Sequence, residues 1–554
     1  FAGRPRPRPR IADRGKQYTV TIPPLRQPFA QHPAGAFIGA PAPALPAMHT
    51  PITPTGLEAQ SELRRRLRSR HLMMIALGGA IGTGLFVASG ASIAQAGPGG
   101  ALLTYTLIGV MVYCLMTSLG ELAVHLPVSG SFVTYSRLYV EEGFGFALGW
   151  NYWFALAVSV AVELAAAQLV MKYWFPGISG MVWSAAFLLL MFGLNAFSVR
   201  GFGEAEYWFS MIKVVTIIVF LLIGLAMIFG IMHGGPQSGW QNFTVGDAPF
   251  VGGVPAMVGV AMIAGFSFQG VETIGVAAGE AENPSRTIPR AIRQTFWRIL
   301  LFYVLAILII GVLLPYTDPN LLRNEATDVG VSPFALVFQH AGLAFAAGMM
   351  NAVVLTALLS SGTSSLYVST RILYDLALEG QAPRWFAKVS TNGVPHRALL
   401  STSAVGALCF FSSLFGDQVV YLWLLNTSAV TCFIAWFGIA LAHYRFRKGF
   451  TSQGHSVEQL AYRSPFFPFG PIMVAILCAV IILGQNTKAL FAPVDNFGAF
   501  IATYCGVILF VAIWLAYRWK FKTRFVKYTE MQFSPAHLQQ PEPTNATATG
   551  VVAN

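Results

Sequence analysis

The sequence predicts an all-α integral membrane protein with twelve transmembrane helices, and three observations support this fold class. First, 55% of the 554 residues are apolar and only 10% are charged, whereas about a quarter of the residues of a water-soluble protein carry a charge. Second, the apolar residues gather in runs of about 20, the length that a helix needs to cross a bilayer. Third, most Lys and Arg residues behind the net charge of +12 stand between these runs. This placement indicates membrane orientation rather than nucleic-acid binding.

Twelve apolar segments define the expected domain organisation. They are residues 71–95, 101–122, 144–173, 181–198, 206–232, 254–279, 296–316, 338–376, 398–415, 419–443, 469–486 and 498–518. We assign them to one domain, 61–533. Residues 1–60 and 534–554 have no helical or strand periodicity and are rich in Pro and small or polar residues, so we expect a disordered arm and a disordered tail. Met48 precedes the first crossing, which leaves open whether residues 1–47 are native.

Clusters of Lys and Arg give the direction of the crossings. They precede the first crossing, separate the sixth from the seventh, and follow the tenth and the twelfth. The opposite connections hold only Lys172, Arg323 and Lys488. Because basic residues concentrate on the cytoplasmic side, we expect both termini to face the cytoplasm.

Motifs for enzymatic or metal chemistry are missing from the sequence. The five cysteines include no C-x-x-C pair and none of the ten histidines lies at i, i+4 beside a Glu, so neither a disulfide framework nor a metal site is predicted. No G-x-x-x-x-G-K-[ST] motif occurs, which disfavours an ATP-driven pump. We therefore expect a protein that is not an enzyme, has no catalytic residues, cofactor or nucleic-acid partner, and draws energy from an ion or substrate gradient.

Two crossings carry glycine-rich interruptions. The first has four glycines within residues 78–84, and the sixth has Gly265 and Gly270 around Phe266 and Ser267. Glycine also serves close helix packing in membranes, and either segment alone permits that explanation. Their matching positions, five helices apart in opposite directions, favour two inverted repeats whose broken helices form a midplane site. The repeats would be 71–232 and 254–443, followed by helices 11 and 12 at 469–518.

A broken membrane helix predicts a ligand. In hydrocarbon an unpaired backbone group costs several kcal/mol, so a break persists only where a ligand or water satisfies it. Free N–H groups at a helix start suit a carboxylate, and free carbonyls at a helix end suit an ammonium group. A zwitterionic amino acid has both. Gly82 and Gly84 would let it approach the backbone, and Thr83 would add a hydroxyl.

Charged residues inside apolar runs are candidates for function. Lys213 in the fifth crossing either extends to the cytoplasmic interface or replaces a bound cation and exchanges a proton. Glu272, just beyond the sixth-helix break, either anchors a cationic substrate and moves protons or ties helix ends together. Glu121 is expected near the cytoplasmic surface, solvated or part of a gate.

Two polar groups are candidates for the lining of the cavity. Tyr152, Leu156, Ser159 and Glu163 lie within about 60° of one another on a helix. Ser364 belongs to a run of small polar residues in the eighth crossing. For both groups, lining a cavity and packing between helices remain open alternatives.

Several motifs resemble the amino-acid transporter family of the APC superfamily. They include Gly79-Ala80-Ile81-Gly82-Thr83-Gly84-Leu85-Phe86, Pro127-Val128-Ser129-Gly130-Ser131-Phe132 and Gly149-Trp150-Asn151-Tyr152. The stretches Arg200-Gly201-Phe202-Gly203-Glu204-Ala205-Glu206 and Gly265-Phe266-Ser267-Phe268-Gln269-Gly270 resemble the lysine-specific members of that family. The resemblance covers residues 63–533. It implies a LeuT-type fold of five plus five inverted helices and proton-coupled uptake by alternating access.

The resemblance also implies site roles. Ile81, Gly82, Thr83 and Gly84 would bind the α-carboxylate. Carbonyls near Phe266 and Ser267 would take the α-ammonium, with Phe266 as a gate and Tyr152 beside the substrate. Lys213 and Glu272 would serve proton coupling, and Glu272 would also bind substrate. Leu156 and Glu163 depart from the aromatic residue and shorter acid expected there, which leaves side-chain selectivity open.

The expected function is proton-coupled import of L-lysine across a bacterial cytoplasmic (inner) membrane. The expected partners are L-lysine, the proton and the lipid bilayer, together with a regulatory membrane protein. Alternatives are a permease for another basic or aromatic amino acid, and a lysine-binding membrane sensor without net transport.

Overall fold

The computed structural model describes residues 81–533, except for 129, 198, 233–238, 279–283, 320, 322–331, 343, 391–392 and 495. The described residues form helices and their connections, and no strand occurs among them. The predicted arm at 1–60, the predicted tail at 534–554 and the first part of the first crossing lie outside the described residues.

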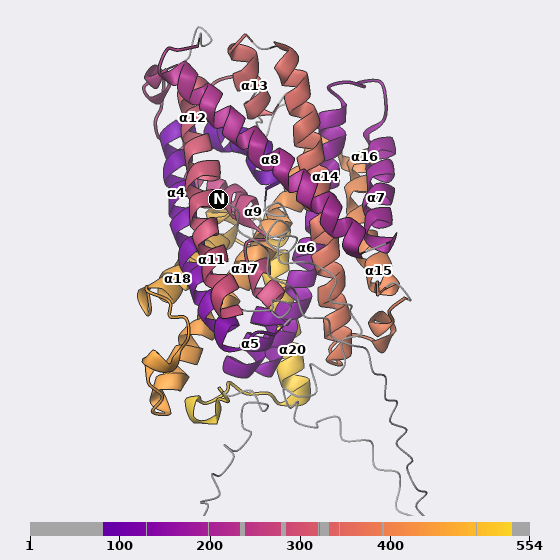
Figure 1. The fold of residues 1–554 in the computed structure, drawn as a ribbon, viewed down its shortest axis with the longest axis vertical. Helices are drawn as coiled ribbons and strands as arrows, with labels where there is room; N and C mark the ends of the chain where they lie inside the picture. The colour runs from indigo at the N-terminus through magenta and orange to yellow at the C-terminus, as the bar shows by residue number, and fades with distance from the viewer. Residues whose placement is uncertain are drawn as a thin grey trace, which may run out of the picture. The chain divides into compact units, whose positions relative to one another are not determined.

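The helices cover most of the described chain (Figure 1). The α-helices are α3 (Thr83–Phe86), α4 (Ala88–His125), α5 (Ser131–Tyr139), α6 (Glu142–Met171), α7 (Gly180–Phe197), α8 (Val199–Ile228), α9 (Gly253–Phe268), α10 (Thr273–Ala277), α11 (Pro284–Arg298), α12 (Leu305–Leu313), α13 (Pro333–His340), α14 (Ala344–Leu378), α15 (His396–Gly406), α16 (Ser412–Phe415), α17 (Asp417–Ser452), α18 (Phe469–Gly484), α19 (Thr487–Phe491) and α20 (Phe497–Phe521). A π-helix, Ile299–Val304, joins α11 to α12.

The helices fit a membrane-spanning protein, as the apolar runs predict. In the described part of the chain, nine helices are long and apolar enough to cross a membrane, and the two apolar helices Gly180–Ala196 and Phe469–Gly484 are shorter. Helices satisfy their backbone hydrogen bonds internally, which hydrocarbon requires. The all-helical membrane fold is therefore confirmed, while the count of twelve crossings and the two inverted repeats stay predictions.

Two element boundaries differ from the expected ones. The end of the first crossing and the whole of the second are assigned to one helix, α4, although the backbone at Gly97 is not helical (φ 74°, ψ 170°). A glycine tolerates this positive φ, and Pro98 follows it directly. The expected segment 338–376 instead divides into α13 and α14 near Gly342, which also has a positive φ of 76°.

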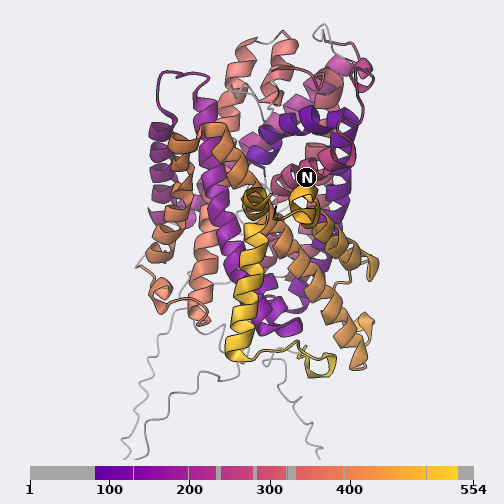
Figure 2. The ribbon, with the colours of Figure 1, turned by 180° about the vertical axis from the view of Figure 1, so that it is seen from behind.

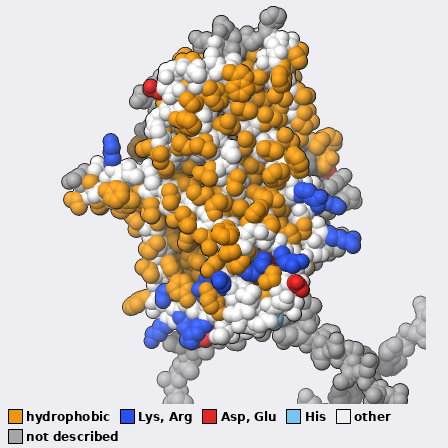
Figure 3. Space-filling model, turned by 90° about the vertical axis from the view of Figure 1, so that its left-hand side faces the viewer, with side chains coloured by type: hydrophobic (Ala, Val, Ile, Leu, Met, Phe, Trp, Pro, Cys, Tyr) orange, Lys and Arg blue, Asp and Glu red, His pale blue; other side chains and the backbone are white. Residues whose placement is uncertain are grey.

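Helix α6 lies at the centre of the helices, and α20 lies at their edge. In the most apolar window of α6, 89% of the residues are buried, compared with 11% for α20. Helices α14 and α17 pack against α6 on the inside, and α20 packs against it from outside (Figure 2). The face drawn in Figure 3 is mostly apolar, with most of its visible Lys and Arg in the lower half. This distribution is what contact with a bilayer requires.

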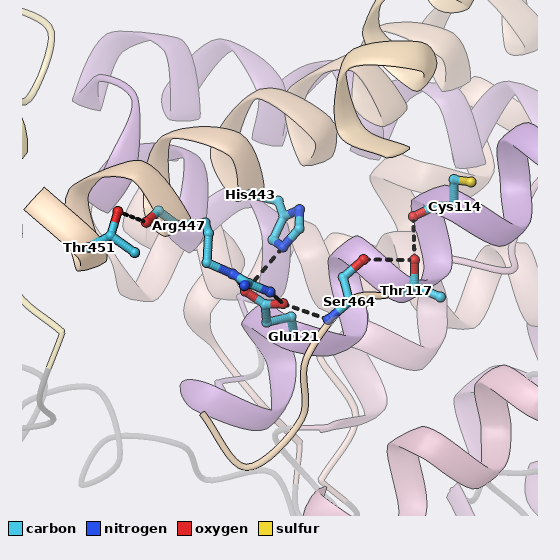
Figure 4. Close-up of polar contacts among 7 residues, drawn as sticks. All are labelled: Cys114, Thr117, Glu121, His443, Arg447, Thr451 and Ser464. Carbon is cyan, nitrogen blue, oxygen red and sulfur yellow. Dashed lines mark hydrogen bonds and ion pairs between the residues drawn. The ribbon is translucent and has the colours of Figure 1, made fainter. Parts of the chain in front are cut away.

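A buried ionic cluster fastens α4 to α17 (Figure 4). Glu121 of α4 accepts a hydrogen bond from Arg447 Nε at 2.6 Å and also pairs with Arg447 Nη2. The ring of His443 lies 3.2 Å from the same carboxylate, and the backbone N–H of Ser464 donates to it at 2.7 Å. Glu121 is fully buried, so the alternative of a solvated carboxylate is wrong.

Tyr462 lies near this cluster, in the connection between α17 and α18. Burial raises the pKa of its hydroxyl to about 12. The phenol is therefore neutral at physiological pH and adds no charge to Glu121 and Arg447.

Candidate functional site

The first predicted break begins at the edge of the described chain. Ile81 and Gly82 are not helical, and the short helix α3 starts at Thr83. The backbone N–H of Thr83 lies 3.3 and 3.4 Å from the two carboxylate oxygens of Glu163, and its hydroxyl donates to Glu163 Oε2 at 2.5 Å. A side chain of α6 therefore satisfies a backbone group that this helix start leaves free.

The second predicted break is complete in the structure. Helix α9 ends at Phe268 and α10 begins at Thr273. Between them, Gly270 has φ of 95°, a conformation that favours glycine. Its N–H lies 3.1 and 3.2 Å from the two carboxylate oxygens of Glu272, so the carboxylate of Glu272 holds the unwound segment in place.

The two breaks lie directly against each other. A Cβ atom added at Gly84 would lie 2.5 Å from Ser267 Oγ and 2.8 Å from the Ser267 backbone nitrogen. At Gly82, a Cβ would lie 2.6 Å from Ser361 Oγ. Only a residue without a side chain fits at these two positions, which explains the glycine spacing found in the sequence.

A cavity of about 30 Å³ lies between the breaks and helices α6 and α14. Its lining consists of Gly82, Gly84, Leu156, Ser159, Glu163, Phe266, Ser267, Gln269, Gly270, Thr273, Ser361, Ser364, Ser365 and Val368. This volume holds about two water molecules, so an amino acid would need the surrounding segments to move apart. Among the described residues, no group of three or more His, Cys, Asp or Glu side chains is arranged to hold a metal ion.

Most of the predicted site residues meet at this cavity. Those that line it are Gly82, Gly84, Ser159, Glu163, Phe266, Ser267 and Ser364. For the polar stripe of helix 3 and for Ser364, the structure thus favours the cavity alternative. Ile81, Thr83, Tyr152, Lys213 and Glu272 are buried but are not part of the lining. Their predicted roles in binding or coupling stay predictions.

Glu163 is the carboxylate that faces the cavity. In addition to Thr83, it accepts a hydrogen bond from Ser361 Oγ at 2.8 Å. Its contacts join α6, the first break and α14, three segments that are far apart in the sequence. The longer acid, a departure from the family pattern, therefore reaches the middle of the candidate site.

Glu272 is held away from the cavity. Tyr152 donates a hydrogen bond to Glu272 Oε1 at 2.8 Å, and Trp436 Nε1 donates to Oε2 at 3.1 Å. Together with the N–H of Gly270, these donors occupy both carboxylate oxygens. In this structure the arrangement matches the alternative in which Glu272 ties helix segments together.

Lys213 is fully buried on α8. Its ammonium interacts electrostatically with the carboxylates of Glu206 and Glu163. A lysine that extended to the interface would be partly exposed, so that alternative is wrong.

Sequence reasoning did not single out Glu206 and Trp436 in this region, nor Thr273 and Val368 of the cavity lining. The spacing of Glu206 and Lys213, seven residues or about two helical turns, would have indicated a shared helix face. Ser361 is part of the polar run that the sequence analysis noted for Ser364. Nothing local indicates Trp436, whose partner Glu272 is 164 residues away.

Comparisons with known proteins identify the family of this chain. The family model described as amino acid permease matches residues 71–530. The lysine-specific permease LysP of Escherichia coli (strain K12) is 64% identical over 471 residues, 85% of this chain and 96% of the relative. For LysP of Lactococcus lactis (strain MG1363) the identity is 47% over 481 residues, 86% and 94% of the two chains. For the histidine permease HisP of the same strain it is 46% over 478 residues, 86% and 99%. The chain belongs to the amino acid permease family.

Proposed function

We propose that this protein imports L-lysine across a bacterial cytoplasmic membrane, coupled to proton entry, by alternating access. The observation that carries the proposal is the meeting of two helix breaks at a cavity lined by a buried carboxylate. The substrate follows from the 64% identity with a relative named a lysine-specific permease, over nearly the full length of that relative.

The cavity suggests how lysine would bind. Its α-carboxylate would meet the backbone N–H groups of Ile81 to Gly84, and its α-ammonium the carbonyls near Phe266 and Ser267. Glu163 is the better candidate for the side-chain ammonium, because it lines the cavity whereas Glu272 does not. Tyr152 would then act indirectly, through its hydrogen bond to Glu272.

Transport requires the site to open to each side in turn. The small cavity supports an occluded state, because no amino acid fits without movement of its walls. Phe266 lines the cavity and would move as the gate. Bound lysine would hold the two breaks together and would thereby favour the conformational change that moves the opening from one side of the membrane to the other.

Coupling would use the buried charges of α6 and α8. Lys213 is a buried basic residue of this region and would take part in proton exchange during the transport cycle. The energy would come from the proton gradient, with no cofactor. A regulatory membrane partner stays a prediction.

Uptake into liposomes that contain the purified protein tests the proposal. With an acidic exterior, labelled L-lysine should accumulate above its external concentration, and a protonophore should abolish the accumulation. Accumulation that required sodium, or none under any gradient, would contradict the proposal.

A permease for histidine is the second candidate, since HisP of L. lactis is nearly as similar as the lysine permease of that strain. Competition by excess arginine, ornithine, histidine or phenylalanine separates the candidates. We expect lysine to compete best, and stronger competition by histidine would favour the second candidate.

A lysine-binding sensor without net transport is the remaining alternative. Such a protein would bind lysine tightly but would exchange no labelled lysine across the membrane.

A further inference from the structure

Two buried carboxylates flank one buried lysine in the middle of the protein. Glu206 is 1% exposed, and Glu163 and Lys213 are buried as well. Lys213 interacts electrostatically with both carboxylates. Glu163 faces the cavity, whereas Glu206 does not line it and has no role in the proposed transport cycle described above.

The helix α8 directs Glu206 and Lys213 to the same side. Seven residues separate them, which places them about 20° apart around the helix. Residues on the opposite side of α8 are exposed, including Trp208 at 65% and Leu222 at 63%. A carboxylate kept on the inner side of a membrane helix requires partners there.

Two neighbouring serines on α14 hold the two carboxylates. Ser360 Oγ lies 2.7 Å from each carboxylate oxygen of Glu206, and Ser361 Oγ donates to Glu163 at 2.8 Å. Ser210, one turn after Glu206, also donates to it at 3.4 Å. Because Ser360 and Ser361 are consecutive, any shift of α14 acts on both carboxylates together.

The charges of this cluster do not balance. Two ionised carboxylates and one ammonium give a net charge of −1, and an uncompensated charge in a buried site is costly. One added proton makes the cluster neutral. Without the carboxylate of Glu206, the pair of Glu163 and Lys213 is already neutral. Adding a proton to that pair would then create a buried charge and would not remove one.

We propose that Glu206 is a positioning residue of the coupling site, which holds the Lys213 ammonium beside Glu163 and supplies the second carboxylate that a transferable proton requires. The proposal rests on the proton coupling of the proposed function. In the described part of the chain, Glu163 and Glu206 receive hydrogen bonds from the hydroxyls of Thr83, Ser210, Ser360 and Ser361 and from the backbone N–H of Thr83. The phenol of Tyr421 on α17 also interacts with Glu163. These groups are uncharged, so they do not change the net charge of the cluster.

Glu206→Gln tests the proposal, because it keeps the size of the side chain and removes its charge. In liposomes, accumulation of labelled lysine driven by a pH gradient should fall at least tenfold. Counterflow, the exchange of internal for external lysine without net proton movement, should stay within about twofold of the wild type. Glu206→Asp should recover part of the accumulation.

Ser360→Ala provides a second variant, since it keeps every charge and removes the hydrogen bonds from Ser360 to Glu206. It should shift the dependence of accumulation on external pH and should have a smaller effect than Glu206→Gln. Thr363→Ala is the matched control on α14: its hydroxyl donates to the backbone carbonyl of Leu359, so the wild-type profile should remain.

Two results would overturn the role of Glu206. One is wild-type pH dependence in Glu206→Gln or, if that variant does not fold, in Ser360→Ala. The other is an equal loss of counterflow and accumulation in Glu206→Gln, which would indicate a structural role. Wild-type protein that accumulates lysine without any dependence on protons would instead overturn the proposed coupling itself.

Discussion

Two groups of buried charges differ in how they are balanced. At the ends of α4 and α17, Glu121 is paired with Arg447 and receives a further hydrogen bond from a backbone N–H. In the middle of the protein, Glu163 and Glu206 share one lysine, and their direct hydrogen bonds come from hydroxyl groups and one backbone N–H. Both groups are buried, but only the first has a full ionic partner for its carboxylate.

This difference distinguishes a structural ion pair from a functional site. A carboxylate with a bidentate arginine and a backbone donor has its charge balanced and its lone pairs hydrogen-bonded. Its ionised form is therefore stabilised, and it does not readily take up a proton. A carboxylate held by hydroxyls retains its attraction for an arriving ammonium or proton. We therefore expect variants of the first group to affect folding and variants of the second to affect transport.

The largest expected effect is on stability, from Arg447→Met. It would leave Glu121 buried without its ionic partner, a loss that costs about 3–5 kcal/mol when one partner of a buried pair is removed. Unfolding in detergent should show a clear decrease in midpoint temperature. Lys448→Met is the control, because Lys448 is exposed on the same helix and its loss should change stability by less than about 0.5 kcal/mol.

The double variant Glu121→Met, Arg447→Met sharpens this test. With both charges removed, most of the lost stability should return. A double variant as unstable as Arg447→Met would show that packing, rather than the charge of Glu121, explains the effect.

The next effect is on transport, from Glu163→Gln. The amide keeps the size of the side chain but loses the charge that attracts the lysine ammonium, so lysine affinity should fall at least tenfold, about 1.4 kcal/mol. The unfolding midpoint should stay the same or rise, because one buried charge is removed. Glu458→Gln, in the connection between α17 and α18, should leave both quantities unchanged. A large stability loss with unchanged affinity would reverse the distinction between the two groups.

The smallest effect is expected from Ser361→Ala. It removes one of the hydrogen bonds to Glu163 while the charge and the contacts with Thr83 remain. Lysine uptake should fall about two- to fivefold, which corresponds to about 0.4–1 kcal/mol, near the net contribution of one ordinary hydrogen bond. Loss as large as that of Glu163→Gln would mean that Ser361 contacts the substrate itself.

The sequence predicted much of this molecule because its main signals are local. Apolar runs indicate the helices, and the glycines at 82 and 84 indicate close approaches to the backbone, which Ser361 makes at Gly82 and Ser267 makes at Gly84. The boundary near Gly342 was less predictable, since it lies within the expected segment 338–376, whereas Gly97 lies between the first two expected crossings. Both α6 and α20 are apolar, with mean hydropathies of 2.0 and 1.3, so apolar composition alone did not predict that α6 is buried and α20 is not.

The partners of the buried charges were not predictable from local patterns. Glu121 and Arg447 are 326 residues apart, and Glu163 and Ser361 are 198 residues apart. Only the fold brings these pairs together. Because the sequence did not indicate Arg447 as the partner of Glu121, Glu121 was expected to be either solvated or part of a gate. Glu206 was missed although its spacing from Lys213 is visible in the sequence, because it stands near the start of the crossing, where an acid is ordinary.

A structure with bound lysine tests the central claim most directly. We expect the α-carboxylate at the backbone N–H groups of residues 81–84, the α-ammonium near the carbonyls of Phe266 and Ser267, and the side-chain ammonium next to Glu163. The walls of the cavity should stand farther apart than they do here. Lysine bound elsewhere, with the two breaks still packed against each other, would contradict the account.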